Sequence, residues 1–355
     1  MAPRHHTVPQ FYLRNFSNEA GQVLLVDRDD VSRTYPTAVR KACAEVGFYR
    51  MDPDVFVVES ERERPHPEVI EQHLSQFERA AAPGMHKLVR TGLADLTKDD
   101  WYHLINFIAL QSVRGNRFRE DMEATGTQAL RVYLGETVTD EQISSWLEER
   151  GELVTAASIS DFREDMLGPI GPHRPRLVPA KEYLIQESMK LALGSIGERL
   201  ADNMGWSVIE ADEAAVLTSD EPVCWWAPGD NPVGYGSAQM VWLPVSRRRI
   251  LQLHDNTVPL AALGLPDLTT PAGRDDLVRF VNGQIATDAH RWIVHHTDDT
   301  PLDDLVLGPR TAWGDELVSV EEEGTTRREI YIHRRMPITP DEQTNGPDPT
   351  SARHP

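Results

Sequence analysis

Apolar residues recur along this chain with two different spacings, and the spacing changes twice. Near the amino terminus, residues 22–27 (QVLLVD) form a compact apolar run between Gly21 and a charged stretch, which indicates a short strand. Residues 54–58 (DVFVV) form a second run of this kind. From about 66 to 204 the apolar spacing is that of amphipathic helices, and after about 206 short strand-like runs return. Strands, then helices, then strands predict the α+β class.

The middle of the chain carries clear helix-start signals. Thr97 precedes two aspartates and an apolar stripe with helical spacing, so it is predicted to cap a helix. Thr139 and Gln142 have the spacing of a capping box for a helix that ends near Arg150. An earlier helix, marked by apolar residues from Val69 onward, is expected to kink or end at residues 83–84 (Pro-Gly).

The last third of the chain alternates strands with one helix. We predict that helix over about 274–294, and we interpret the histidine-containing run 290–296 as its carboxyl end, where the helix dipole favours His. Residues 316–320 and 329–333 predict a hairpin across Gly324. The polar, proline-rich tail from Pro337 is expected to be disordered.

These elements predict a mixed or antiparallel sheet with strands from both chain ends and a large helical insert. Residues 1–65 would supply the amino-terminal strands and residues 66–204 a helical subdomain. Residues 205–336 would supply the strands and helix that complete the sheet, and residues 337–355 the disordered tail.

The amino-acid composition narrows the classes of partner that the protein is expected to bind. The 56 acidic residues outnumber the 36 basic ones and give a net charge of −20. Phosphate backbones and anionic membranes repel such a chain, so non-specific nucleic-acid binding is not expected. A small-molecule or protein partner is favoured. The sequence does not fix the oligomeric state.

Targeting and cofactor signals are sparse in this sequence. No stretch of 18 apolar residues and no signal peptide is recognisable, so we expect a cytoplasmic protein without a membrane span. Two cysteines, Cys43 and Cys224, cannot build a disulfide framework or a cysteine-rich zinc site. Neither standard glycine-rich phosphate loop occurs, and no nucleotide cofactor is expected.

Polar side chains crowd the segment of residues 5–16 (HHTVPQFYLRNF) between aromatic ones. This segment resembles the opening motif of a large, mostly bacterial family known as domain of unknown function 4238. Further elements of that family have ordered matches over about 290 residues: Phe48-Tyr49, Gln111-x-x-Arg114, Ser219-Asp220-Glu221-Pro222, Leu243-Pro244-Val245-Ser246 and Val281-Asn282. The family more often has Asn at the position of Glu221. The resemblance implies a shared fold and a shared site, but no reaction.

Three residues are candidate metal ligands. His5 and His6 carry imidazoles, the commonest neutral ligands, and Asp220 follows a short strand at a place where sites are often built. They could hold a divalent metal ion if they meet. The structural alternatives are a hydrogen-bonded core histidine or a solvated terminus for the histidines, and an Asx turn for Asp220.

Charged residues of the predicted helices form a second candidate group. Gln111 and Arg114 are three apart and would share a helix face, where the Arg114 guanidinium suits a carboxylate or phosphate. Glu71 and Glu78 are seven apart and would also share a face. They could divide acid and base roles, or Arg114 could simply pair with one of them in an ion pair between helices.

Two functional hypotheses follow. The first is a metal-assisted hydrolase that acts on a phosphoester or similar small substrate, with Glu71 or Glu78 as general base and Arg14 and Arg114 neutralising developing charge. Substrate contacts would come from polar side chains of the matched motifs: Gln10, Arg14, Asn15, Gln111 and Asn282. The second is a binding or regulatory module in which the same residues form a structural network. The first requires that the amino-terminal imidazoles, Arg114 and Asp220 share one cleft.

Overall fold

The structure is a computed structural model that describes residues 3–52, 66–167, 179–229, 233–323 and 326–338. By their contacts, the described residues form two compact units. The first consists of those within Met1–Phe118 and Lys181–Gly308, and the second of those within Arg119–Ala180 and Pro309–Pro355.

One antiparallel sheet of the first unit joins the two ends of the sequence. Its strand order is β3 (Asp30–Ala38), β2 (Gln22–Asp27), β10 (Trp292–His295) and β6 (Thr218–Ser219). The α+β class, and a sheet with strands from both sides of a helical middle, are therefore confirmed. The buried apolar side chains of β2 and β10 explain why these distant segments pair.

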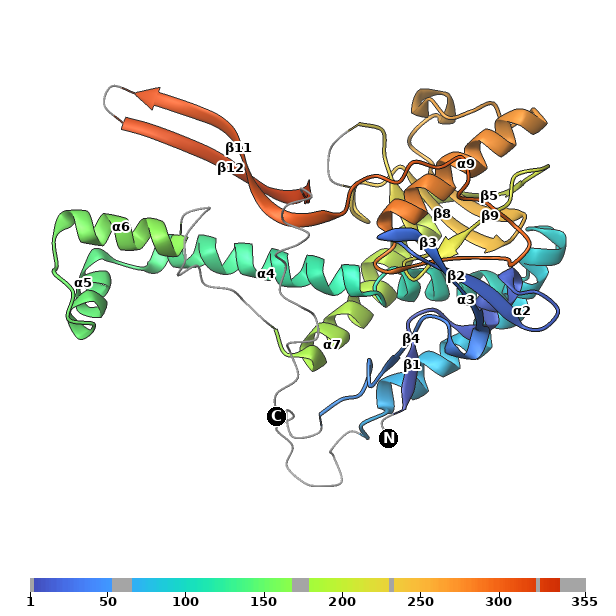
Figure 1. Cartoon of the computed structure of the whole chain (residues 1–355), viewed down its shortest axis with the longest axis horizontal. Coiled ribbons are helices and arrows are strands. Elements are labelled where there is room, and N and C mark those ends of the chain that lie inside the picture. Colours follow the sequence, from blue (N-terminus) through green and yellow to red (C-terminus); the bar gives the residue numbers. More distant parts are fainter. Residues whose placement is uncertain (1–2, 53–65, 168–178, 230–232, 324–325, 339–355) are drawn as a thin grey trace. The chain divides into compact units, whose positions relative to one another are not determined.

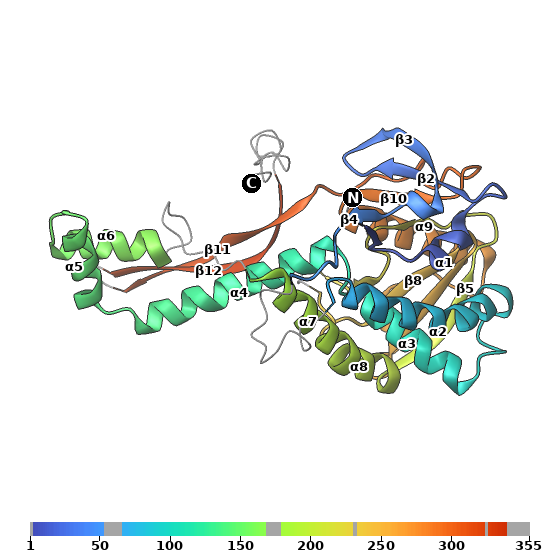
Figure 2. The same cartoon turned by 90° about the horizontal axis from the view of Figure 1, so that it is seen from below.

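A second antiparallel sheet comes from the later part of the chain. Its order is β5 (Met204–Glu210), β9 (Arg249–Asp255), β8 (Met240–Ser246) and β7 (Cys224–Trp226). Figures 1 and 2 show it between α9 (Pro271–Asp288) on one side and α2 (Val69–Thr91) and α3 (Lys98–Gln111) on the other. Every residue of β8 is buried, which is why this strand reads as a continuous apolar run.

Short elements complete the first unit. At the amino terminus, β1 (Arg4–His6) pairs with β4 (Ala44–Val46), and α1 (Gln10–Leu13) follows β1. Short 3-10 turns lie at Arg14–Phe16, Val39–Lys41 and Leu260–Leu263. A long helical stretch runs as α7 (Lys181–Leu191), a π segment (Ala192–Ile196) and α8 (Gly197–Asp202).

The prediction that α2 kinks or ends at Pro83-Gly84 is wrong, because the helix continues to Thr91. Gly84 lies against α3 so closely that a Cβ there would be 3.1 Å from the Cβ of Asp100 and 3.3 Å from Leu104. Packing between the two helices therefore outweighs the local cost of the proline.

The end of α9 also differs from the prediction. The helix stops at Asp288, and residues 292–295 form β10 between β2 and β6. The run 290–296 is thus not a helix carboxyl end. Ile293 and Val294 are fully buried and belong to a strand that has a neighbour on each side. Burial on both faces of this central strand outweighs the local preference of the segment for a helix.

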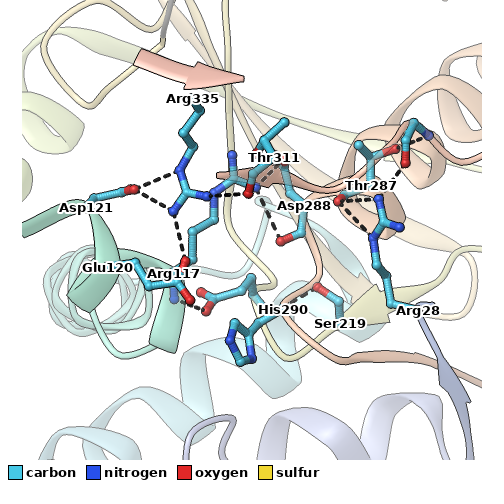
Figure 3. A network of polar contacts seen from close by, with 12 residues as sticks. Arg28, Arg117, Glu120, Asp121, Ser219, Thr287, Asp288, His290, Thr311 and Arg335 are labelled. Carbon is cyan, nitrogen blue, oxygen red and sulfur yellow. Dashed lines mark hydrogen bonds and ion pairs between the residues drawn. The ribbon is translucent and has the colours of Figure 1, made fainter. Parts of the chain in front are cut away.

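In the second unit, α5 (Asp140–Glu149) and α6 (Ala156–Leu167) follow α4 (Asn116–Thr137), whose first residues belong to the first unit. The predicted late hairpin is confirmed and longer than expected, as β11 (Thr311–Glu323) and β12 (Thr326–Pro337). Trp313 and Arg335 both donate to the Asp121 carboxylate at 2.8 Å and tie the hairpin to α4. Figure 3 shows the contact between Arg335 and Asp121.

The strand predicted at 54–58 lies outside the described residues, as does the predicted disordered tail from residue 339 onward. The tail is expected to begin at Pro337, but Pro337 is the last residue of β12. Within the part of the chain that the structure describes, every helix is too short or too polar to cross a bilayer.

Candidate functional site

A pocket of about 420 Å³ opens in the first unit where the two chain ends meet. Its wall combines three carboxylates, three cations and a histidine. These charged and titratable residues are Glu45, Asp220, Glu221, Arg4, Lys41, Arg291 and His290; the rest of the wall is Thr7, Leu25, Cys43, Ala44, Gly115, Asn116 and Trp292.

Asp220 is fixed by the backbone around it. Because β6 pairs with β10 (Ser219 opposite Ile293), the residue after β6 lies beside the start of β10. Its carboxylate accepts N–H groups from three successive residues, His290 at 2.9 Å, Arg291 at 2.8 Å and Trp292 at 2.9 Å. Burial raises the pKa of Asp220, although these three hydrogen bonds oppose the rise.

Glu221 is positioned by the amino-terminal turn of α4. Its Oε1 accepts the backbone N–H of Arg117 at 3.0 Å, in the first turn of α4, where the helix dipole favours a negative group. Its carboxylate oxygens lie only 1.9 Å from the point that a Cβ on Gly115 would occupy. The residue as a whole is half-buried, but its carboxyl end is packed against the α4 amino terminus.

The two adjacent carboxyls cannot both ionise easily in this wall. Burial, together with the charge of Asp220, raises the pKa of Glu221 to about 8. Asp220 uses its oxygens to accept three amides, whereas Glu221 accepts one. We therefore assign the proton at neutral pH to Glu221 and the negative charge to Asp220.

Cys43 lies on the same wall in an unusual backbone conformation, with φ of 47°. Thr7 holds it there by donating both its N–H (2.9 Å) and its hydroxyl (3.1 Å) to the Cys43 carbonyl. Burial raises the pKa of the thiol well above its usual value, so the thiol stays protonated. Cys43 thus shapes the pocket rather than supplying a thiolate.

The predicted metal ligands do not come together. His5 Nδ1 accepts the N–H of Tyr49 at 2.8 Å, and its Nε2 lies 2.5 Å from Glu68, so both ring nitrogens are engaged. His6 contacts the Arg40 carbonyl through Nε2 at 3.3 Å, and burial lowers its pKa. No His, Cys, Asp and Glu side chains among the described residues form a group of three that could hold a metal ion.

The prediction that Arg114 shares a helix face with Gln111 is wrong, because Arg114 lies beyond the end of α3. It is buried, binds Glu78 at 2.8 Å and donates to the His6 carbonyl at 2.8 Å. Burial raises the pKa of the nearby Glu71, one of whose carboxylate oxygens is buried without a hydrogen-bond partner. These residues form a charged network beneath the amino-terminal strand.

The remaining predicted residues do not line the pocket. Gln111 donates to the Thr7 carbonyl at 2.9 Å, and Asn282 accepts from Leu217 at 3.1 Å. Gln10 begins α1, Arg14 is exposed and Asn15 lies in the following turn. Of the residues predicted from sequence, the structure places Asp220 alone in the pocket wall.

Sequence reasoning missed Glu221 and His290 as site residues. Glu221 stands in the same motif as Asp220, and a second carboxyl beside the first was a signal that could have been used. The predicted helix over about 274–294 places His290 at a helix end, whereas in the structure His290 lies between α9 and β10. Nothing in the sequence marks Lys41, which reaches the pocket only through the fold.

Comparison with known proteins adds a family but no activity. No curated protein and no solved structure matches the chain. Residues 4–299 match a family described as protein of unknown function (DUF4238). The match covers most of the chain and includes every residue of the pocket wall. The chain therefore belongs to the DUF4238 family.

Proposed function

We propose that this pocket is the active site of a hydrolase for small phosphoesters, which works by general acid–base catalysis. The observation that supports the proposal is that the adjacent carboxyls of Asp220 and Glu221 line one pocket with His290 and three cations. Burial and the charge of Asp220 raise the pKa of Glu221 to about 8. A carboxyl with a pKa near the working pH is suited to proton transfer.

In the proposed reaction, His290 accepts a proton from a water molecule as the water oxygen attacks phosphorus. The bond from phosphorus to the leaving oxygen breaks, and Glu221 donates its proton to that oxygen. The products are an alcohol and phosphate. Proton exchange with solvent returns both side chains to their starting states. The charge of Asp220 raises the pKa of Glu221 and so favours the form that carries the proton to be donated.

The cations define the substrate class. Arg4, Lys41 and Arg291 carry three positive charges, against the negative charges of Glu45 and Asp220 once Glu221 holds a proton. The resulting surplus of positive charge favours a small anion, although the whole chain is strongly acidic. A volume of about 420 Å³ suits a metabolite-sized phosphoester.

The divalent metal suggested by His5, His6 and Asp220 remains a separate prediction. Metal analysis of the purified protein, followed by chelation, tests it directly. Full activity after chelation would overturn the metal prediction and leave the proposed acid–base pair unaffected.

The main test is Glu221→Gln, which keeps the shape and the hydrogen bond from Arg117 but cannot release a proton. We expect kcat on a panel of phosphoesters, beginning with p-nitrophenyl phosphate, to fall about 10²-fold to 10⁴-fold. The matched control is Glu182→Gln. Glu182 is also buried and accepts one backbone N–H, that of Asp52 at 2.9 Å, but it does not line the pocket.

The alternative function, a binding module, predicts a different outcome. In that case no phosphoester is turned over, inorganic phosphate still raises the melting temperature of the wild type, and Glu221→Gln changes that rise little. Turnover that is lost in Glu221→Gln but kept in Glu182→Gln would favour the enzyme.

The raised pKa of Glu221 can be tested without a substrate. Since its folded pKa (about 8) lies above the ordinary value of 4.5, the folded state binds the extra proton between these values. Its contribution to the free energy of unfolding is then fully present below pH 4.5 and is lost as the pH rises through 8. Glu221→Gln should therefore gain stability relative to wild type between pH 5 and 8.5, measured by urea denaturation. A constant difference across that range would contradict the assignment of the proton.

A further inference from the structure

We propose that Arg117 is a positioning residue that fixes His290 in the pocket it shares with Glu221, by holding the turn between α9 and β10. This inference rests on the proposed function, because it concerns the geometry of the same acid–base pair. Arg117 itself does not line the pocket.

Arg117 contacts Glu221 directly and also contacts the segment that carries His290. Its backbone N–H donates to Glu221 Oε1 at 3.0 Å. Its guanidinium donates to the carboxylate of Asp288 and, at 3.3 Å, to the Asp288 carbonyl, as Figure 3 shows. Asp288 is the last residue of α9 and precedes His290 by two positions. One residue thus links the general acid to the segment that carries the general base.

The turn is held at three successive points. Arg28, which is buried, donates to the Thr287 carbonyl at 3.3 Å and to the Gly308 carbonyl at 2.5 Å. Arg117 holds Asp288, and Asp220 accepts the N–H groups of residues 290–292. If the Arg117 side chain is removed, the Arg28 and Asp220 contacts remain. The protein should therefore still fold, while the segment between them gains freedom.

A purely structural ion pair is the competing explanation, and the other end of α9 supplies a matched control. Arg274 binds Asp212 through two nitrogens, at 2.9 and 3.0 Å, and a backbone carbonyl at 3.3 Å. Its side chain is 27% exposed, against 29% for Arg117. The two arginines make similar contacts with similar burial, but only Arg117 also touches Glu221.

The experiment compares Arg117→Met with Arg274→Met in the full chain, with p-nitrophenyl phosphate or the most active phosphoester of the panel as probe. We expect Arg117→Met to lower kcat about tenfold to hundredfold, the range for a small misplacement of a catalytic group, with KM nearly unchanged. Arg117→Lys should recover part of the loss. Arg274→Met should lose similar stability and keep kcat.

Asp288→Asn tests whether Arg117 acts through Asp288. The double variant with Arg117→Met should be no slower than the slower single variant, since both remove one interaction. Additive losses would overturn this route.

A second measurement does not depend on turnover. The positive charge of Arg117 lowers the pKa of Glu221, so Arg117→Met should move the Glu221 titration to higher pH, measured from stability with and without Glu221→Gln. An unchanged titration and an unchanged kcat in Arg117→Met would overturn the inference. Full activity in Glu221→Gln would instead overturn the proposed function.

Discussion

Two buried aspartates show how residue context decides charge. Asp275 accepts the backbone N–H groups of Asp212, Glu213 and Ala214, and Asp220 accepts three N–H groups in the same manner. Burial opposes ionisation at both, but the amides prevail at Asp275 and lower its pKa, whereas burial prevails at Asp220 and raises its pKa. The pocket therefore holds the Asp220 carboxylate in surroundings that disfavour its ionised form.

Gly115 is the residue that makes room for the Glu221 carboxylate. Gly115→Ala would place a Cβ within 1.9 Å of both carboxylate oxygens and force the side chain out of its site. Because a flexible side chain can move, we expect a stability loss of only about 1 kcal/mol, together with a loss of activity comparable to that of Glu221→Gln. Gly236→Ala, with open space around it, is the control for kcat and melting temperature.

At the scale of elements, helix starts were well predicted because their signals are local. Thr97 with Asp100, and Thr139 with Gln142, form reciprocal capping boxes at the starts of α3 and α5. The failures came where contacts distant in sequence decide the outcome. Pro83 stays inside α2 because Gly84 packs on α3, and residues 292–295 form a strand because β2 and β6 flank them.

The two capping boxes differ in charge, which gives a pH prediction. Hydrogen bonds from Lys87 and Thr97 lower the pKa of Asp100 to about 2, from 3.8. Its contribution to the free energy of unfolding is present above pH 3.8 and is lost as the pH falls through 2. The stability gap between wild type and Asp100→Asn should therefore narrow between pH 5 and 2.5 in urea denaturation. The gap for Gln142→Ala, in the uncharged box, should show no such titration.

At the scale of the whole molecule, β10 unites segments nearly 270 residues apart: its residues Trp292–His295 pair with Asp27–Leu24 of β2. The pocket lies at this junction, since its wall includes residues of β1 and β4, the two residues after β6, and residues at the start of β10. The candidate site therefore exists only when both ends of the family match are folded together.

Shortening a buried side chain of β10 should consequently lower the stability of the first unit as a whole. Ile293 is fully buried, and Ile293→Ala should lower the free energy of unfolding by about 2–5 kcal/mol, measured by denaturant titration. Val31→Ala, at a position 49% exposed on β3, should change it by less than about 0.5 kcal/mol. Equal losses in the two variants would argue against β10 as the central strand.

The sequence by itself determined the α+β class, strand β2, both capping boxes, the late hairpin and the family, because each depends on neighbouring residues or on an ordered set of motifs. Tertiary structure alone decided the site. It engaged His5 and Arg114 in a structural network and brought Lys41, Glu221 and His290 to one pocket with Asp220. The physical reason is that burial and neighbouring charge set both the position and the protonation of a side chain, and neither depends on spacing along the chain.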